Sequence, residues 1–464
     1  MKFTTEQLNF IEKARISISD DPRTRLNTVV KEIIDDDNCI FDAHCHVFDG
    51  KCINLKYLAI RMIAGAVEED LQWVWRLIKR EYHSEKHFFK PDDGVGKNEI
   101  IELIYNKIII DNDISPALDR MQNEIEKMEV ELVKQKEDIM PLKIKFIHKW
   151  KQIIEFLQSN SMEEVFKKFE QEYAIHHLIN KYNGGNAKLV TIVLGMDLNK
   201  GWDDSIPKKW EEQNSELTSL SKKYPILPFL PIDPRRENLY EVFLEAFNQK
   251  NPQFFGVKCY PALGYLPSHD RLMPIFQICA EKNIPVMTHC GGEKIFTFDY
   301  PIKTNRRGDT VVINDSDRKL RARKLNEPTE WEYVLQEYNK LRLCFGHFGG
   351  KYAWENNQEI SHRINEILSM MKNYENVYAD FSFNIESHKA VENFTEMLSK
   401  DDINGKLMRE RTLFGTDFWV ILPSSDLIEA QKNFINKINN IDNKNILLKS
   451  LLRKNVLNFL KLNK

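Results

Sequence analysis

The sequence lacks the features of a secreted or membrane-spanning protein. Its seven cysteines are scattered and include no C-x-x-C pair, which favours reduced thiols and a cytoplasmic location. No uninterrupted apolar run approaches about 18 residues, the length of a membrane-spanning helix. The N-terminal stretch MKFTTEQLNFIEKAR mixes charged and apolar residues, which is not typical of a signal peptide. We therefore expect a cytoplasmic protein with no membrane partner.

The chain also has little net charge and no nucleotide-binding motif. A formal charge of −3 gives no general attraction to nucleic acid or to an anionic membrane. Neither a G-x-x-x-x-G-K-[ST] loop nor a dinucleotide fingerprint occurs. The expected partner is a small-molecule substrate, nucleic acid is not expected, and a homo-oligomer stays open.

Short apolar runs recur along the 464 residues, and helical patterns separate most of them. Runs without strict polar alternation are typical of parallel strands that are buried on both faces. Eight such strands alternating with helices predict an α/β fold, a (β/α)8 or TIM barrel, although an open doubly wound sheet is the competing topology. The predicted strands are CIFDAH (39–44), KLVTIVLGM (188–196), ILPFLPI (226–232), FFGVKCY (254–260), IPVMTH (284–289), LRLCFGH (341–347), NVYADFSF (376–383) and TLFGTD (412–417).

The gap between the first two strands is far longer than a βα unit requires. Apolar residues at spacings of three and four from Leu118 to Leu132, and again from Phe146 to Leu157, predict a helical hairpin there. We therefore expect residues 1–54 to hold an N-terminal helical segment and strand one, residues 55–182 to form a large helical insertion, and residues 183–464 to complete the barrel. The insertion is either a lid over the site or an element for packing or oligomerisation.

Polar residues stand where barrel enzymes build their sites, at the carboxyl ends of the strands. In FDAHCHVFDG (41–50), His44 and His46 project to the same face of strand one, because residues i and i+2 of a strand do so. His289, His347 and Asp417 end three later strands. One of these residues alone is more often structural, as a hydrogen-bonded histidine or a helix-capping aspartate. Together at one mouth they indicate a metal site.

The same segments resemble the amidohydrolase superfamily, in particular its amidohydrolase-related branch of metal-dependent hydrolases, decarboxylases and hydratases. The resemblance covers strand one and nearly everything from residue 188 onward, whereas residues 55–182 match nothing in that family. The segments that carry it are DAHCH (42–46), GVKCYP (256–261), PVMTHCG (285–291), EWEYVLQEYNKLRLCFGHFGG (330–350), NVYADFSF (376–383), LFGTDF (413–418) and LLRKNVLNFL (451–460).

The resemblance implies that one divalent cation is held by four side chains: His44, His46, His289 and Asp417. Three imidazoles and a carboxylate suit Zn²⁺ best, with Mn²⁺, Co²⁺ or Fe²⁺ as alternatives. Such a cation lowers the pKa of a bound water towards about 7. Asp417 would take a proton from that water, and His347 would donate a hydrogen bond to the oxyanion or hold the substrate carbonyl.

Lys258 has three competing interpretations. It could be a carbamate that bridges a second metal ion, an anchor for a substrate carboxylate, or a structural lysine that reaches water. Tyr260, two residues further on, is a candidate wall of the substrate pocket. A second open case is the segment 303–324, with eight Lys or Arg against three Asp. It is either solvated surface or a loop that attracts anionic substrates.

The predicted function is a metal-dependent hydrolase that cleaves an amide, ester or lactone bond of a small, anionic substrate. The first alternative keeps the site but performs non-oxidative decarboxylation or hydration of a carboxylated ring or dienoic acid. The second is a binding or assembly protein on the same scaffold.

Overall fold

The computed structural model describes residues 2–52, 155–156, 158–202, 206–291, 295–297, 299–356, 361–422, 426–442 and 445–463. These residues group into two compact units. The first contains Met1–Val47, Ser161–Asp204 and Lys209–Lys464, and the second contains Phe48–Asn160 and Ser205–Lys208.

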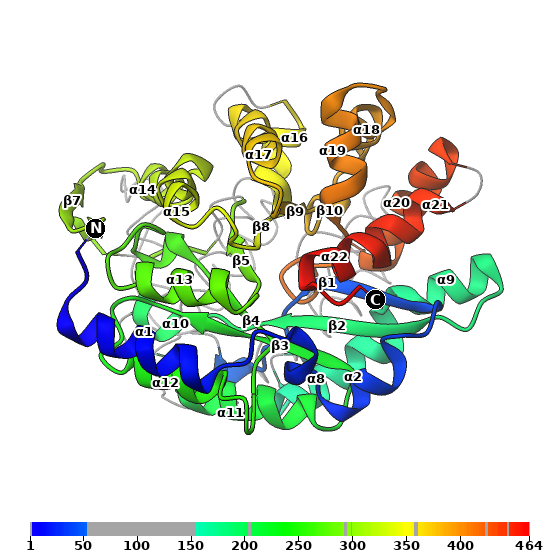
Figure 1. Cartoon of the computed structure of the whole chain (residues 1–464). Helices are drawn as coiled ribbons and strands as arrows, with labels where there is room; N and C mark the ends of the chain where they lie inside the picture. Colours follow the sequence, from blue (N-terminus) through cyan, green and yellow to red (C-terminus); the bar gives the residue numbers. More distant parts are fainter. Residues whose placement is uncertain are drawn as a thin grey trace, which may run out of the picture. The chain divides into compact units, whose positions relative to one another are not determined.

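Eight parallel strands form one sheet of the first unit, in the order of the chain (Figure 1). Each predicted apolar run coincides with one of them in whole or in part, because both faces of every strand are buried or nearly so. The strands are β1 (Cys39–Cys45), β2 (Lys188–Leu194), β3 (Ile226–Ile232), β4 (Gly256–Cys259), β5 (Val286–His289), β8 (Leu343–Gly346), β9 (Val377–Asp380) and β10 (Thr412–Leu413).

The last strand returns to the first, so the sheet closes into a barrel. The Ala43 amide donates to the Phe414 carbonyl at 2.9 Å, and the Asp417 amide donates to the His44 carbonyl at 2.7 Å. A parallel bridge between Cys45 and Phe418 continues this seam. The (β/α)8 prediction is therefore confirmed, and the open doubly wound alternative is wrong.

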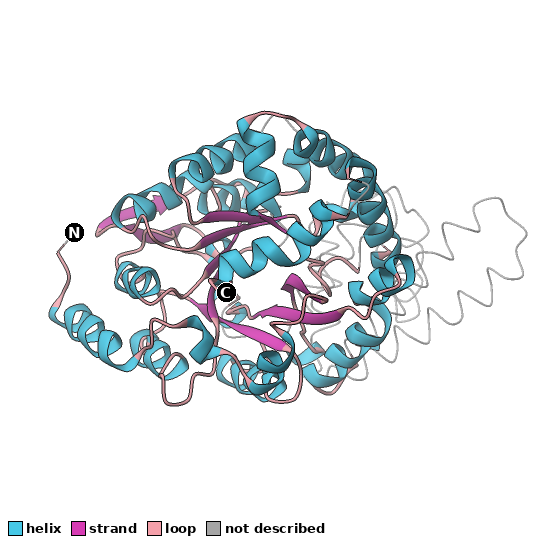
Figure 2. Ribbon diagram, turned by 45° about the vertical axis from the view of Figure 1, so that its right-hand side comes forward, coloured by secondary structure: helices cyan, strands magenta, loops and turns pink. Residues whose placement is uncertain are grey.

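Helices lie outside the strands (Figure 2). The helical patterns between the predicted strands include YEVFLEAFNQ (240–249), LMPIFQICAEKN (272–283) and WEYVLQEYN (331–339), and each of these contains or overlaps a helix. The helices that follow or flank the strands are α1 (Thr5–Ser17), α2 (Thr28–Ile33), α10 (Leu198–Gly201), α11 (Trp210–Ser221), α12 (Leu239–Ala246), α13 (Met273–Glu281), α15 (Glu332–Glu337), α16 (Lys351–Trp354), α17 (His362–Asn373), α18 (His388–Ser399), α19 (Ile403–Arg411), α20 (Leu427–Ile441), α21 (Ile446–Lys449) and α22 (Asn455–Leu460).

Most of the predicted insertion lies outside the described residues, including the seam from Leu118 to Leu132 and nearly all of the second run. Its C-terminal part is described and is helical. It contains α8 (Met162–Lys168), a π-helical turn at Phe169–Tyr173, and α9 (Ile175–Asn183).

The basic segment 303–324 forms a β-hairpin followed by a helix. Strands β6 (Ile302–Arg306) and β7 (Asp309–Ile313) pair antiparallel, and α14 (Arg318–Leu325) follows. Arg307 and Gly308, at the turn between them, both have positive φ, as a two-residue hairpin turn requires. Several of the cations pair with carboxylates: Arg306 with Glu330, Arg307 with Glu337, and Lys324 with Asp315. Part of the positive charge is thus neutralised locally.

Each of the seven cysteines is a buried, free thiol. Among the described residues, no helix has both the length and the apolar character needed to cross a bilayer.

Candidate active site

Strand pairing brings the predicted site residues to one end of the barrel. His289 is the last residue of β5 and pairs with Gly346 of β8, so His347 follows directly beside it. His44 lies in β1 and His46 directly after it, while the seam described above places Asp417 next to His44. All seven predicted residues are buried, with exposures of 0% for His44, 2% for His46, 1% for Lys258, 5% for Tyr260, 7% for His289, 5% for His347 and 2% for Asp417.

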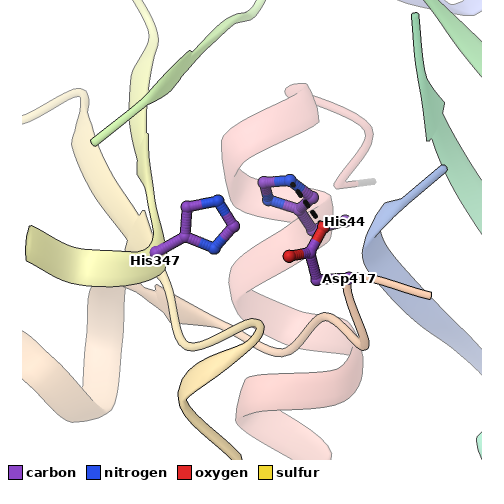
Figure 3. A group of neighbouring side chains, drawn as sticks. All are labelled: His44, His347 and Asp417. Atoms are coloured by element: carbon purple, nitrogen blue, oxygen red, sulfur yellow. Dashed lines mark ion pairs between the residues drawn. The ribbon is translucent and has the colours of Figure 1, made fainter. Parts of the chain in front are cut away.

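Three of these side chains form a compact group that could hold a cation. One ligand atom each from His44, His347 and Asp417 lies within 4.8 Å of the others. Figure 3 shows the His347 imidazole on one side and the His44–Asp417 pair on the other. The Asp417 Oδ1 atom is 3.7 Å from His44 Nε2 and 3.4 Å from His46 Nε2. His46 therefore adds a fourth donor at the edge of the group.

The chemistry of this donor set fits a divalent metal ion. Burial lowers the pKa of His44 and of His347 well below the ordinary value, and the Lys258 ammonium adds to the effect. Burial, with Lys258, also lowers the pKa of His46 to about 3. The imidazoles are therefore neutral at physiological pH and carry the lone pair that metal binding requires. Nitrogen and carboxylate donors of this kind suit Zn²⁺.

His289 contacts His347 in this structure. Its Nδ1 atom lies 3.1 Å from His347 Nε2, and the Tyr260 ring stacks on the His289 ring with centroids 4.0 Å apart. The four-ligand set that includes His289 stays a prediction, since the compact group contains His347 in its place. Tyr260 contacts the site through this stacked imidazole.

Lys258 lies inside the cluster. Its Nζ atom is 3.5 Å from His44 Nε2. Burial lowers the pKa of Lys258 to about 8, although the Asp380 and Asp417 carboxylates oppose that shift. The ammonium is thus held in a low-dielectric site by two acids. The interpretation as a lysine that merely reaches water does not fit a side chain with 1% exposure.

Sequence reasoning missed three residues that hold the site together. Asp380, the last residue of β9, contacts His44 Nδ1 through Oδ2 at 2.9 Å. The Ser382 hydroxyl lies 3.0 Å from His347 Nδ1. Asp42 accepts from the Thr416 hydroxyl at 2.6 Å and from the Thr416 amide at 3.0 Å, which fixes the loop that carries Asp417. The sequence does contain a signal for two of these residues, because Asp42 and Asp380 are acidic residues within apolar strands.

The backbone around the site is strained. Positive φ is uncommon outside glycine and costs energy, most of all for large side chains, so it persists where surrounding structure imposes it, often at functional sites. The residues with this conformation at the strand ends are His347 (φ 62°), Phe348 (φ 42°), Phe383 (φ 57°), Asp417 (φ 53°) and Trp419 (φ 75°).

Glycines make room for two of the imidazoles. A Cβ atom on Gly415 would lie 2.5 Å from the Cβ of His44, and one on Gly291 would lie 2.7 Å from Cδ2 of His347. Such distances are below contact, so these positions require glycine for close packing.

Together, the closed barrel and its polar mouth define a TIM-barrel enzyme site. The family model described as Amidohydrolase matches residues 234–436, which include Lys258, His289, His347 and Asp417. The predicted resemblance is confirmed over residues 234–436, which match the amidohydrolase family model, and the chain is an enzyme. A search of curated proteins finds no match.

Solved structures with a similar fold include three barrel proteins. An uncharacterised TIM-barrel protein from Bordetella bronchiseptica is 16% identical, with 64% of this chain and 85% of that chain covered and a TM-score of 0.41. A 5-carboxyvanillate decarboxylase from Novosphingobium aromaticivorans, complexed with manganese, is 13% identical, with 74% and 92% covered and a TM-score of 0.40. An amidohydrolase from Burkholderia multivorans with bound zinc is 12% identical, with 62% and 87% covered and a TM-score of 0.38. All three TM-scores lie below 0.5.

Proposed function

We propose that this chain is a metal-dependent hydrolase that cleaves an amide, ester or lactone bond of a small, anionic substrate. The observation that carries the proposal is the convergence of His44, His347 and Asp417 within 4.8 Å at the carboxyl ends of the barrel strands. A divalent cation bound there, Zn²⁺ or else Mn²⁺, Co²⁺ or Fe²⁺, would supply Lewis acidity and a water of lowered pKa. A second cation would require carbamylated Lys258.

The protein's own residues then take distinct roles. Asp417 accepts the proton of the attacking water and passes it to the leaving group. Its backbone amide, bound to the His44 carbonyl, fixes the position of this carboxylate. Lys258 pairs with a carboxylate of the substrate, and the stacked pair of Tyr260 and His289 forms one wall of the pocket.

A second candidate, decarboxylation or hydration of a carboxylated ring or dienoic acid, is favoured by Lys258. A buried ammonium in the cluster would hold a carboxylated substrate beside the acid–base group. The discriminating experiment incubates the metal-loaded protein with a panel of small carboxylates, amides, esters and lactones. Release of CO₂ supports decarboxylation, and hydrolysis products support the first proposal.

The anchor role of Lys258 has its own test. A Lys258→Met variant should raise KM for carboxylated substrates by more than it lowers kcat. Lys250→Met is the matched control, because Lys250 is exposed in the turn between α12 and β4. An equal loss for substrates with and without a carboxylate would contradict the anchor.

We also propose that the chain divides into residues 1–54, 55–182 and 183–464, and that the protein is cytoplasmic. Residues 55–182 act as a lid or as an oligomerisation element. Light scattering of the intact chain tests the second alternative, since a monomer would exclude it.

A further inference from the structure

Asp380 is the hub of the hydrogen bonds behind the metal-binding cluster. Its side chain is fully buried at the end of β9. Oδ2 lies 2.9 Å from His44 Nδ1. Oδ1 accepts from the Ser382 hydroxyl, from the Ser382 amide at 3.1 Å and from the His347 amide at 3.1 Å. One carboxylate thus contacts both β1 and the residue that follows β8.

The direction of these hydrogen bonds determines where the ring protons lie. A carboxylate only accepts, so the His44 nitrogen that faces Asp380 must carry hydrogen. The single hydroxyl proton of Ser382 goes to Asp380. The Ser382 oxygen can therefore only accept from His347 Nδ1, 3.0 Å away. His347, like His44, is protonated on Nδ1.

The consequence concerns the other nitrogen of each ring. A neutral imidazole with hydrogen on Nδ1 has its lone pair on Nε2. The Nε2 atom of His44 is the one that lies near Asp417 and Lys258. The Nε2 atom of His347, 3.1 Å from His289 Nδ1, carries no hydrogen and therefore cannot donate. This differs from the oxyanion-donor role that the family resemblance implies for His347.

We propose that Asp380 and Ser382 are positioning residues that fix His44 and His347 in the Nδ1-protonated form and so present both Nε2 lone pairs to a divalent cation. The role in cation binding rests on the proposed function. Carboxylates and hydroxyls behind histidine ligands orient the ring and raise its basicity, and their removal typically weakens metal affinity by about 10–100-fold.

The test measures Zn²⁺ affinity of metal-stripped full-length protein by competition with a chromophoric chelator. Ser382→Ala removes the acceptor of His347 and one donor to Asp380, whereas Asp380→Asn alters the carboxylate that contacts His44 itself. We expect both variants to bind Zn²⁺ about 10–100-fold more weakly. Ser382→Thr, which keeps the hydroxyl, should restore the affinity. Ser268→Ala is the matched control, because Ser268 is fully buried and its hydroxyl has no hydrogen-bond partner among the described residues.

A second arm observes the ring protons without metal. ¹⁵N–¹H correlation spectra of histidine-labelled protein, assigned with His44→Gln and His347→Gln variants, should show both rings protonated on Nδ1. Hydrogen on Nε2 in either ring would overturn the inference, as would wild-type Zn²⁺ affinity in Ser382→Ala and Asp380→Asn. Absence of Zn²⁺ binding in the wild-type protein would instead overturn the proposed function, and the spectra would then decide the inference alone. Should Asp380→Asn fail to fold, Ser382→Ala and the spectra still decide it.

Discussion

The Nδ1 atom of His46 lies 2.8 Å from the carbonyl oxygen of Leu194, the last residue of β2. A carbonyl only accepts, so Nδ1 carries the hydrogen and the Nε2 lone pair is left for the cluster. Pairing of β1 with β2 thereby orients a side chain of the site. Backbone geometry, rather than a neighbouring side chain, holds this imidazole.

Removal of the β1 histidines should abolish metal binding. In a His44→Ala/His46→Ala double variant, the cluster loses two of its imidazoles, and the remaining donors are too few for a stable site. We expect bound metal to fall from about one ion per chain to almost none, measured by elemental mass spectrometry of the purified protein.

His388→Ala is the control for this measurement, because His388 is exposed at the start of α18. Its metal content should equal that of the wild type. Equal metal in the double variant would contradict the metal centre and favour the binding or assembly alternative.

Replacement of Asp417 by Asn should stop turnover without unfolding the protein. The amide keeps the size of the side chain but cannot accept a proton as a carboxylate does, and general acid–base catalysis contributes about 10²–10⁴-fold. We expect kcat to fall by about that factor on whichever panel substrate the wild type converts. Circular dichroism and metal content are recorded in parallel, and Asp401→Asn, at an exposed carboxylate, is the control. Retained turnover would exclude Asp417 as the base.

The barrel could be predicted from sequence because its strands are buried on both faces. Runs such as ILPFLPI have no polar face, and this run coincides with β3 in full. Strand ends were less accurate. TLFGTD yields only the two-residue β10, because the residues after it bend away to bond with β1 and to place Asp417. We did not predict the β6–β7 hairpin from the sequence, although Arg307 and Gly308 form a two-residue turn between its strands.

The site was predicted in part for a similar reason. Strand ends identify which side chains reach the mouth, but not which of them touch. The contact between His347 and Ser382 depends on the register of β8 against β9, which the sequence does not specify. Asp380 lies within NVYADFSF, and the apolar residues around it indicate a buried strand rather than a functional acid. The position of a strand can be predicted from sequence without knowing its register. Hydrogen bonds between side chains of neighbouring strands cannot.

Alanine at Gly415 should destabilise the protein and weaken its metal site. The added Cβ would lie 2.5 Å from the Cβ and 2.8 Å from the amide nitrogen of His44, so β1 or the 415 loop must shift. Overpacking of this kind costs about 1–3 kcal/mol. Urea unfolding should show that loss, together with lower Zn²⁺ affinity.

Gly185→Ala is the matched control, because nothing lies within 4 Å of its added Cβ. It should leave both the free energy of unfolding and Zn²⁺ affinity unchanged. Wild-type values for Gly415→Ala would show that the close approach to His44 does not constrain the site.

Glu170 should make the stability of the protein depend on pH. It lies in the π-helical turn Phe169–Tyr173, its Oε1 atom has no hydrogen-bond partner among the described residues, and burial raises its pKa to about 7, with His177 opposing the shift. Between pH 4.5 and 7 the folded chain holds a proton that the unfolded chain has released. The free energy of unfolding therefore falls as pH rises through this range, and the loss is complete above pH 7.

A Glu170→Gln variant cannot ionise at this position, so it should gain stability over the wild type as pH rises from 4.5 to 8. The difference between the two proteins is measured by urea unfolding at each pH, which cancels the titration of the buried histidines that both share. Glu172→Gln, at an exposed residue of the same turn, should show no such growing difference. A gap between Glu170→Gln and the wild type that stays constant with pH would mean that the Glu170 carboxyl titrates alike in the folded and unfolded chains.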